Sequence, residues 1–108
     1  MTEKKNGIIR IYCDKAEKKL WYEYFIFNNK REGEYKDYYK NGQLYEIVNY
    51  KNNNLEGEHK QYWVNKQLSV IYNYKNNKKE GKYKGYQNNG ELYMTFNYKN
   101  DKRVIYKI

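Results

Sequence analysis

The side chains best suited to a chemical task are lysines and tyrosines that recur at a fixed spacing. The lysines at positions 36, 60 and 84 stand 24 residues apart, and a tyrosine follows each of them two residues later. Interleaved cations and rings can meet phosphates and stack on bases, or can form the main contacts of a protein interface. The candidate binding residues are Lys36, Tyr38, Tyr45, Lys60, Tyr62, Lys84, Tyr86 and Tyr93. Repetition alone also produces such rows, as a solvated face on which lysine stems cover tyrosine rings.

Groups that could carry out catalysis are scarce. The chain has one histidine, one cysteine and three aspartates. His59 occupies the repeat position that Tyr35 and Tyr83 hold elsewhere, which indicates a structural role, and Cys13 lacks a basic histidine nearby. No metal-ligand spacing and no phosphate-binding glycine loop occurs in the sequence. We therefore expect a protein that is not an enzyme and that uses no cofactor and no metal.

Three glycines mark an internal repeat. Gly33, Gly57 and Gly81 are 24 residues apart, and each begins a similar phrase. A fixed period of this size is typical of repeat architectures. The sequence predicts one domain over residues 1–108, with units at about 7–32, 33–56, 57–80 and 81–104 and a closing strand at 104–108.

Each unit has the pattern of a β-hairpin. In residues 33–56, two tyrosine-rich runs flank Asn41-Gly42, the pair that favours a two-residue type I′ turn. Counting outward from this turn predicts a core face with the pairs Tyr39–Leu44, Asp37–Glu46, Tyr35–Val48 and Gly33–Tyr50. The opposite face then pairs Tyr38 with Tyr45 and Lys36 with Ile47. The opposed carboxylates of Asp37 and Glu46 fit this core face poorly.

Polar four-residue loops, such as Asn52 to Leu55, should connect the units. Tight closure of these loops predicts that Lys51 faces Glu56 and that Tyr50 and Tyr74 face Gly57 and Gly81, with each tyrosine ring over bare glycine backbone. The residues predicted to be structural are Gly33, Gly57, Gly81, Tyr50, Tyr74, Tyr98, Leu44, Leu68 and Leu92. The expected fold is all-β, an elongated and curved single antiparallel sheet made of consecutive hairpins.

Composition limits the partners only loosely. The net charge of +9 favours nucleic acid, anionic membrane or an acidic protein surface. Only three of the 22 basic residues are arginine, which disfavours sequence-specific base readout. Lysine, asparagine and tyrosine all have AT-rich codons, so coding bias is an alternative source of the charge. The lone cysteine and the absence of an apolar signal segment indicate a cytoplasmic protein.

Both ends of the predicted sheet are apolar. The segments 8–13 and 104–108 contain no proline, and outer strands of this kind invite pairing with another chain. Homodimerisation through an edge and addition of a strand to a partner are therefore two hypotheses for this sheet.

The repeat resembles the bacterial MORN-type repeat (membrane occupation and recognition nexus) in its antitoxin-like variant. The likeness lies in Gly33-Glu34-Tyr35, Tyr38-Tyr39, Asn41-Gly42-Gln43-Leu44 and Tyr50-Lys51-Asn52, and it extends over about residues 7–108. The family usually places a glycine after that last asparagine; this chain has Asn53, Asn77 and Asp101.

The resemblance implies a binding module. Its first reading is an inhibitor of a partner protein, such as an antitoxin, an immunity protein or a phage-encoded inhibitor of a defence nuclease. One alternative is non-specific binding of RNA or single-stranded DNA through the lysines and tyrosines. The other is a scaffold on anionic membrane surfaces, which lacks a visible amphipathic anchor.

Overall fold

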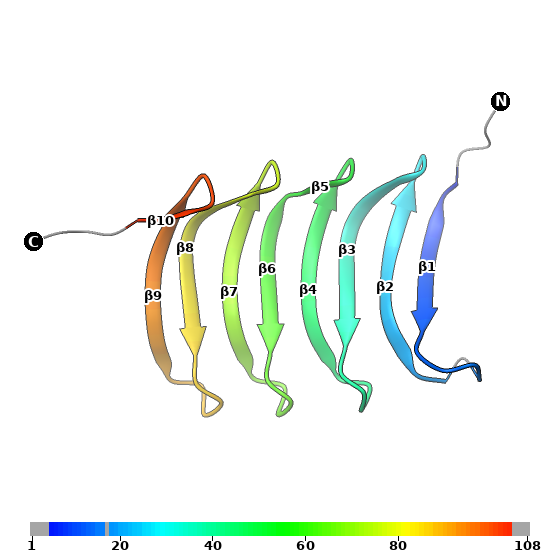
Figure 1. Cartoon of the computed structure of the whole chain (residues 1–108), viewed down its shortest axis with the longest axis horizontal. Helices are drawn as coiled ribbons and strands as arrows, with labels where there is room; N and C mark the ends of the chain where they lie inside the picture. The colour runs from blue at the N-terminus through cyan, green and yellow to red at the C-terminus, as the bar shows by residue number, and fades with distance from the viewer. Residues whose placement is uncertain (1–4, 17, 105–108) are drawn as a thin grey trace, which may run out of the picture.

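The computed structural model describes residues 5–16 and 18–104, and these residues form a single antiparallel sheet (Figure 1). Each strand pairs with its neighbours in sequence, in the order β1-β2-β3-β4-β6-β7-β8-β9-β10, and short β5 extends the pairing of β4. The strands are β1 (Gly7–Tyr12), β2 (Leu20–Phe27), β3 (Lys30–Tyr38), β4 (Leu44–Lys51), β5 (Asn54–Leu55), β6 (Gly57–Tyr62), β7 (Leu68–Lys75), β8 (Lys78–Tyr86), β9 (Leu92–Lys99) and β10 (Lys102–Val104).

The sheet is long and one layer thick, with extents of 58 × 36 × 14 Å. Its strands are bowed, and two rows of loops run along its two long sides (Figure 1). The prediction of an all-β, open sheet of consecutive hairpins with a 24-residue period is confirmed. Of the expected closing strand at 104–108, only Val104 belongs to the described residues, where it ends β10.

The loops at Asn41-Gly42 differ from the predicted type I′ turn. The N–H of Gly42 bonds to the carbonyl of Tyr39 at 2.9 Å, and the N–H of Tyr39 bonds to the carbonyl of Gln43 at 2.8 Å. Only Gly42 has a positive φ, of 88°. The loop therefore has three residues, a type I turn followed by one left-handed residue. The Asn41 side chain accepts the N–H of Gln43 at 3.0 Å, which satisfies a turn donor.

The true two-residue turns lie at the other row of loops, which we call the Asn tips. Their central pairs are Asn28-Asn29, Asn52-Asn53, Asn76-Asn77 and Asn100-Asp101, each with φ near 50° and 70°. Positive φ at both positions is the type I′ geometry. The shorter turn pairs Lys51 with Asn54 and Tyr50 with Leu55, so the predicted facing of Lys51 with Glu56 and of Tyr50 with Gly57 is wrong.

Bulges restore the register between the two kinds of loop. Tyr38 pairs with Leu44 while Asp37 pairs with Glu46, which leaves Tyr45 as an extra residue. Away from this bulge the predicted pairs hold, namely Gly33–Tyr50, Tyr35–Val48, Lys36–Ile47 and Asp37–Glu46. The pairs Tyr39–Leu44 and Tyr38–Tyr45 are wrong, because the three-residue loop shifts the register by one until the bulge corrects it.

The repeated glycines sit at a second kind of bulge, between repeats. Tyr50 pairs with Leu55, whereas Ile47 pairs with Lys60, so the stretch containing Gly57 carries two extra residues. Gly33, Gly57 and Gly81 have φ of 79°, 90° and 86°, a region that favours glycine. A methyl group added at Gly33 or Gly81 would have no neighbour within 4 Å, so no tyrosine ring covers these glycines. Their role is conformational, and the predicted ring-over-glycine contact is wrong.

Neighbouring Asn tips are bonded to one another at each step along the sheet. Arg31 and Leu55 donate their N–H groups to the side chains of Asn53 and Asn77, each at 2.7 Å, and Lys79 donates to Asp101 at 2.6 Å. A glutamate one residue before each repeat glycine accepts a further N–H from the next tip. These bonds are Asn52 to Glu32 at 2.8 Å, Asn76 to Glu56 at 2.9 Å and Asn100 to Glu80 at 3.0 Å. The tips thus form a continuous hydrogen-bonded rail.

Candidate binding surface

One face of the sheet carries most of the packed rings, and we call it the Tyr face. Toward β2 and β3, the rings of Tyr22, Tyr24 and Tyr35 stack with centroids 5.6 to 6.3 Å apart. Toward β9, Tyr83 stacks on Phe96 at 4.4 Å. The only buried apolar side chains among the described residues are Val48 and Tyr72, both on this face. A single row of aromatic side chains therefore serves as the core, and the described residues provide no second layer to cover it.

Cationic side chains lie over aromatic rings of the Tyr face on the side of the Asn tips. The Arg31 guanidinium lies 4.9 Å from the centre of the Tyr24 ring, and the Lys79 ammonium lies 5.2 Å from the centres of both Tyr72 and Tyr98. Arg103 lies 4.3 Å from the centre of Phe96. Cations over ring faces are attracted by the ring quadrupole. These contacts give the polar rim of the Tyr face a positive charge.

An acidic pair and the histidine occupy the middle of the Tyr face. Asp37 and Glu46 are opposed on neighbouring strands, and His59 Nε2 lies 2.5 Å from Glu46 Oε1. Gln61 Nε2 donates to the same oxygen at 3.0 Å. The bond to His59 holds the pKa of Glu46 well below its usual range, while burial and the bond with Glu46 raise the pKa of Asp37 to about 6. The predicted structural role of His59 agrees with this position, since the ring is buried and lies 4.5 Å from that of Tyr72.

Exposed rings follow the Tyr face along the row of loops opposite the Asn tips. This loop-side aromatic row consists of Trp21, Tyr45, Trp63 and Tyr93, with exposed fractions of 53%, 37%, 38% and 53%. Tyr45 lies against Tyr39, with centroids 5.0 Å apart, and a methyl group at Gly85 would lie 3.2 Å from the Tyr93 ring. Tyr45 and Tyr93 were predicted on the lysine side of the sheet. That placement is wrong, because each is the extra residue of a bulge and turns to the Tyr face.

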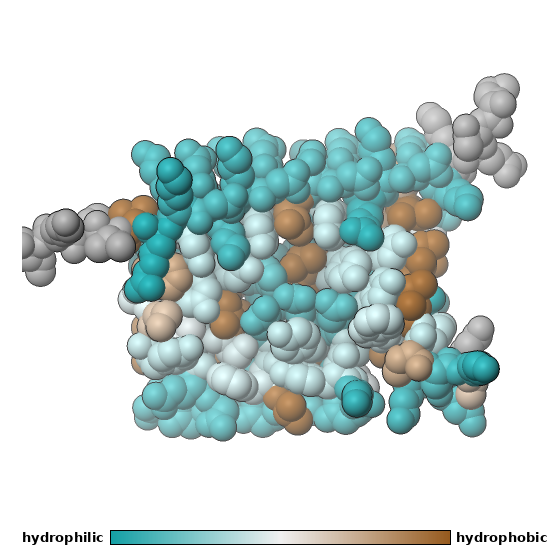
Figure 2. Space-filling model, viewed as in Figure 1, coloured by the Kyte–Doolittle hydropathy of each residue, from teal (hydrophilic) through white to brown (hydrophobic). Residues whose placement is uncertain are grey.

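The loop-side aromatic row borders a cavity. A cavity of about 420 Å³ opens beside Trp63 and Tyr93, with Gln87 and Asn88 completing its lining. Trp63 is fixed there by its Nε1, which donates to the carbonyl of Tyr86 at 3.1 Å. Across the face shown in Figure 2, pale side chains of intermediate hydropathy lie between two hydrophilic bands that follow the loop rows. Aromatic side chains that are fixed in position and surrounded by a polar rim are typical of protein interfaces.

The opposite face carries the predicted lysine row, and we call it the Lys face. Lys36, Lys60 and Lys84 alternate across the strands with Ile47 and Ile71, as the pairs between neighbouring strands show. Tyr38, Tyr62 and Tyr86 lie beside them and pair with Leu44, Leu68 and Leu92. These leucines were predicted on the core face; the bulges place them on the Lys face instead.

Acidic groups reduce the charge of the Lys face. Glu23 pairs with Lys36 across the strands and accepts the Tyr38 hydroxyl at 2.6 Å and Arg10 Nε at 3.1 Å. Burial raises the pKa of Tyr38, and its hydroxyl is committed to this bond. Lys60 lies 3.7 Å from Glu58. The structure therefore brings the predicted lysines and tyrosines together, but it places carboxylates beside Lys36 and Lys60.

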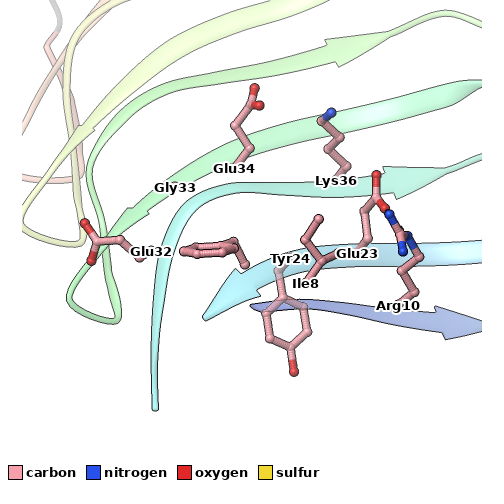
Figure 3. Close-up of a pocket in the computed structure, with 9 residues that line it drawn as sticks. Ile8, Arg10, Glu23, Tyr24, Glu32, Gly33, Glu34 and Lys36 are labelled. Carbon is pink, nitrogen blue, oxygen red and sulfur yellow. The ribbon is translucent and has the colours of Figure 1, made fainter. Parts of the chain in front are cut away.

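A cavity of about 400 Å³ lies on the Lys face between β1 and β3 (Figure 3). Figure 3 shows Ile8, Glu23 and Lys36 on one side of the sheet and Tyr24 pointing away from them. Two of its carboxylates already have partners: Glu23 pairs with Arg10 inside the cavity, and Glu32 accepts an N–H from Asn52 outside it. No set of free polar groups converges there, as a catalytic site would need.

Other kinds of site find little support in the described residues. Within residues 5–16 and 18–104, no cluster of three or more His, Cys, Asp or Glu side chains could hold a metal ion. None of these residues forms a helix of the length and hydropathy needed to cross a bilayer. Cys13 is an exposed free thiol.

Comparison with known proteins identifies the repeat. The model of the MORN repeat variant matches three consecutive stretches, residues 31–52, 55–76 and 79–100. No curated protein and no solved structure matches the chain. MORN repeats are generally non-catalytic modules that bind proteins or membrane lipids. Since the matched stretches make up more than half of the sequence and coincide with the observed hairpins, the chain belongs to the MORN repeat variant family.

Proposed function

We propose that this protein is a non-catalytic protein-binding module that inhibits its partner by covering part of the partner's surface. An antitoxin, an immunity protein or a phage-encoded inhibitor of a defence nuclease acts in this way. Inhibition by occlusion requires area and complementarity and no reacting group. The observation that carries the proposal is the loop-side aromatic row of Trp21, Tyr45, Trp63 and Tyr93 on an uncovered face.

The energetics of interfaces favour this row over the rest of the surface. Binding free energy concentrates in a few aromatic and arginine side chains that become desolvated. The rings of the row keep few rotamers, so little conformational entropy is lost when they are covered. One face of a sheet measuring 58 × 36 Å has ample room for a standard interface of about 800 Å² per partner.

Charge indicates the kind of partner surface. The net charge is +9, and Arg31, Lys79 and Arg103 line the Asn-tip rim of the Tyr face. An acidic partner would be attracted during encounter and would meet these cations at the rim. We place the protein in the reducing cytoplasm, where the exposed Cys13 thiol would remain free.

The experiment is a tagged pull-down from the host lysate with three matched proteins. These are the wild type, a variant with Trp21→Ala and Tyr93→Ala, and a variant with Lys36→Ala and Lys60→Ala. A stoichiometric protein retained by the wild type after nuclease treatment, lost by the aromatic variant and kept by the lysine variant supports the proposal. Addition of the purified module to that protein should then block its activity. Retention that is insensitive to the aromatic substitutions overturns the role of the Tyr face.

Binding of RNA or single-stranded DNA is the second candidate, because Lys36, Lys60 and Lys84 do form one row across the Lys face. It predicts an affinity that falls steeply with salt and a smaller salt slope in the lysine variant. The carboxylates of Glu23 and Glu58 within the row weigh against it. A membrane-surface scaffold would require retention on anionic but not neutral vesicles.

A further inference from the structure

The edge strand β1 has features of a strand that is paired on both sides. It runs from Gly7 to Tyr12, ends the sheet on one side, and pairs only with β2 among the described residues. It has little of the usual protection of an edge, since it contains no proline, its only charged side chain is Arg10, and Ile8 is 56% exposed. Residues before it reproduce the bonds of the Asn-tip rail: Lys5 donates to Asn29 at 2.7 Å, and Asn6 accepts from Asn28 at 2.8 Å.

The repeat shows which kind of strand belongs beside β1. Each junction between repeats places the second strand of one hairpin against the first strand of the next, as in β2 with β3, β4 with β6 and β7 with β8. β1 is a first strand, so a second strand is missing beside it. The strands β2, β4, β7 and β9 are all paired on both sides.

The described edges of a second copy do not offer a second strand. The far edge of the described sheet is β10, which follows an Asn tip and so is also a first strand. Two copies would bring first strands together and could not recreate the repeat junction. A second strand beside β1 would therefore come from a partner protein and not from an edge of another copy.

The chemistry of the missing strand follows from what β1 presents. On the Lys face, Arg10 takes the position of Lys36 and Lys60, whose neighbours across the junction are Glu23 and Ile47. Half of the Arg10 side chain is exposed, although its Nε already bonds to Glu23. A carboxylate opposite Arg10 would complete its charge pairing. On the Tyr face, Ile9 pairs with Tyr24 and Ile11 pairs with Tyr22. Apolar side chains of an added strand would therefore pack against these two isoleucines.

We propose that β1 accepts an extended segment of a partner protein by antiparallel strand addition, with alternating apolar residues against Ile9 and Ile11 and an acidic residue opposite Arg10. Main-chain hydrogen bonds hold such a segment, and the alternating side chains select it. The inference deepens the proposed protein-binding function, but it uses an edge of the sheet and not the loop-side aromatic row.

Synthetic peptides based on this protein's own second strand provide the probe. The parent peptide has the sequence of residues 44–51, and two derivatives carry Ile47→Glu or Ile47→Lys at the position that meets Arg10. A fourth peptide combines Ile47→Glu with N-methylation of alternate residues, which removes main-chain donors while keeping every side chain. Binding to the full chain is measured by fluorescence anisotropy, and its location by amide hydrogen exchange.

The expected order of affinity is Ile47→Glu above the parent and the parent above Ile47→Lys. N-methylation should weaken binding by about tenfold or more, since several main-chain hydrogen bonds are lost together. Protection should appear in residues 7–12 and not in 102–104. In an Arg10→Gln protein, the advantage of the Ile47→Glu peptide should disappear while the parent peptide still binds.

Absence of binding, equal binding of the N-methylated peptide, or protection at β10 alone would overturn strand addition at β1. The outcome is separable from the proposed function. A Trp21→Ala and Tyr93→Ala protein should bind the peptides as the wild type does, while an Arg10→Gln protein retains the loop-side aromatic row.

Discussion

Asn53 and Arg31 exchange two hydrogen bonds across neighbouring repeats. The Arg31 N–H donates to the Asn53 side-chain oxygen at 2.7 Å, and the Asn53 N–H donates to the Arg31 carbonyl at 3.0 Å. The residues are 22 positions apart in sequence. Asn53 also holds the left-handed position of its turn, with a φ of 70°. One residue therefore both shapes a tip and bonds it to the tip before.

Substitution of Asn53 separates these two roles. Asn53→Gly keeps the left-handed turn but leaves the Arg31 N–H without its acceptor, and we expect a loss of about 1 kcal/mol in the free energy of unfolding. Asn53→Ala loses the acceptor and also strains the backbone, so its expected loss is about 2 to 3 kcal/mol. Urea denaturation followed by tryptophan fluorescence measures both. Lys51→Ala, an exposed change on the same tip, is the control and should stay within about 0.5 kcal/mol.

Substitutions at Gly57 and Gly85 separate the effect of backbone strain from that of a close side-chain contact. Gly57→Ala places a side chain at a φ of 90° and should destabilise the fold by about 1 to 2 kcal/mol, although Asn49 leaves room for the methyl group at 3.8 Å. Gly85 has no such φ, and its new methyl group would meet the Tyr93 ring at 3.2 Å. Because Tyr93 is exposed and can turn aside, Gly85→Ala should change stability by less than about 0.5 kcal/mol. Its effect should appear in the NMR signals of the Tyr93 ring, which Gly57→Ala should leave in place.

The sequence predicted the sheet and most of its register because both depend on the period and on strand alternation. Gly33–Tyr50 and Asp37–Glu46 were found by counting, and the structure pairs them so. The ends of the hairpins were mispredicted because two kinds of loop were exchanged. Asn-Gly favours a two-residue turn in isolation, but here that turn is formed by Asn52-Asn53, whose second residue gains an interrepeat bond.

The bulges explain which candidate residues changed face. A bulge adds one residue, so Tyr45 and Tyr93 moved to the Tyr face while Leu44 and Leu92 moved to the Lys face. No local sequence pattern predicts a bulge, although Trp21, Tyr45 and Tyr93 occupy the same position of their repeats and all have large aromatic rings. The role of Glu56 was missed because the units were counted from glycine. In that division Glu56 and Glu80 are the last residues of their units, but the last residue of the next unit is Val104. The position therefore does not agree across the three units, and the 24-residue spacing of Glu32, Glu56 and Glu80 is not apparent.

Asp37 gives the protein a pH dependence with a defined sign. Its pKa in the folded state is raised to about 6, from an ordinary value near 3.8, by burial and by Glu46. The folded state then binds the proton more tightly than the unfolded state, so the stabilisation is full below about pH 4 and is lost as pH rises toward 6. Glu46 has the opposite shift, and its contribution is gained as pH rises through the range below 4.5.

Asp37→Asn should remove the loss between pH 4 and 6. The amide can donate to Glu46 without the proton, so the variant should be more stable than the wild type at pH 7, by about 1 kcal/mol after allowance for solvent screening. Thermal unfolding between pH 4 and 7.5 measures the difference, which should vanish near pH 4. Asp101→Asn, at an Asn tip, is a control for the removal of one negative charge. Parallel curves for wild type and Asp37→Asn would contradict the assignment.

The glutamates of the rail test whether charge or geometry holds the tips together. Glu56 accepts the N–H of Asn76 at 2.9 Å from the preceding repeat. Glu56→Gln keeps an acceptor of nearly the same shape and should cost a few tenths of a kcal/mol, whereas Glu56→Ala should cost about 1 kcal/mol. Hydrogen exchange at the Asn76 amide should accelerate only in Glu56→Ala. Asn6 already fills this acceptor position with a neutral side chain for Asn28 at 2.8 Å, which argues that the repeat needs the oxygen and not its charge. Equal losses in the two Glu56 variants would show instead that the carboxylate charge is required.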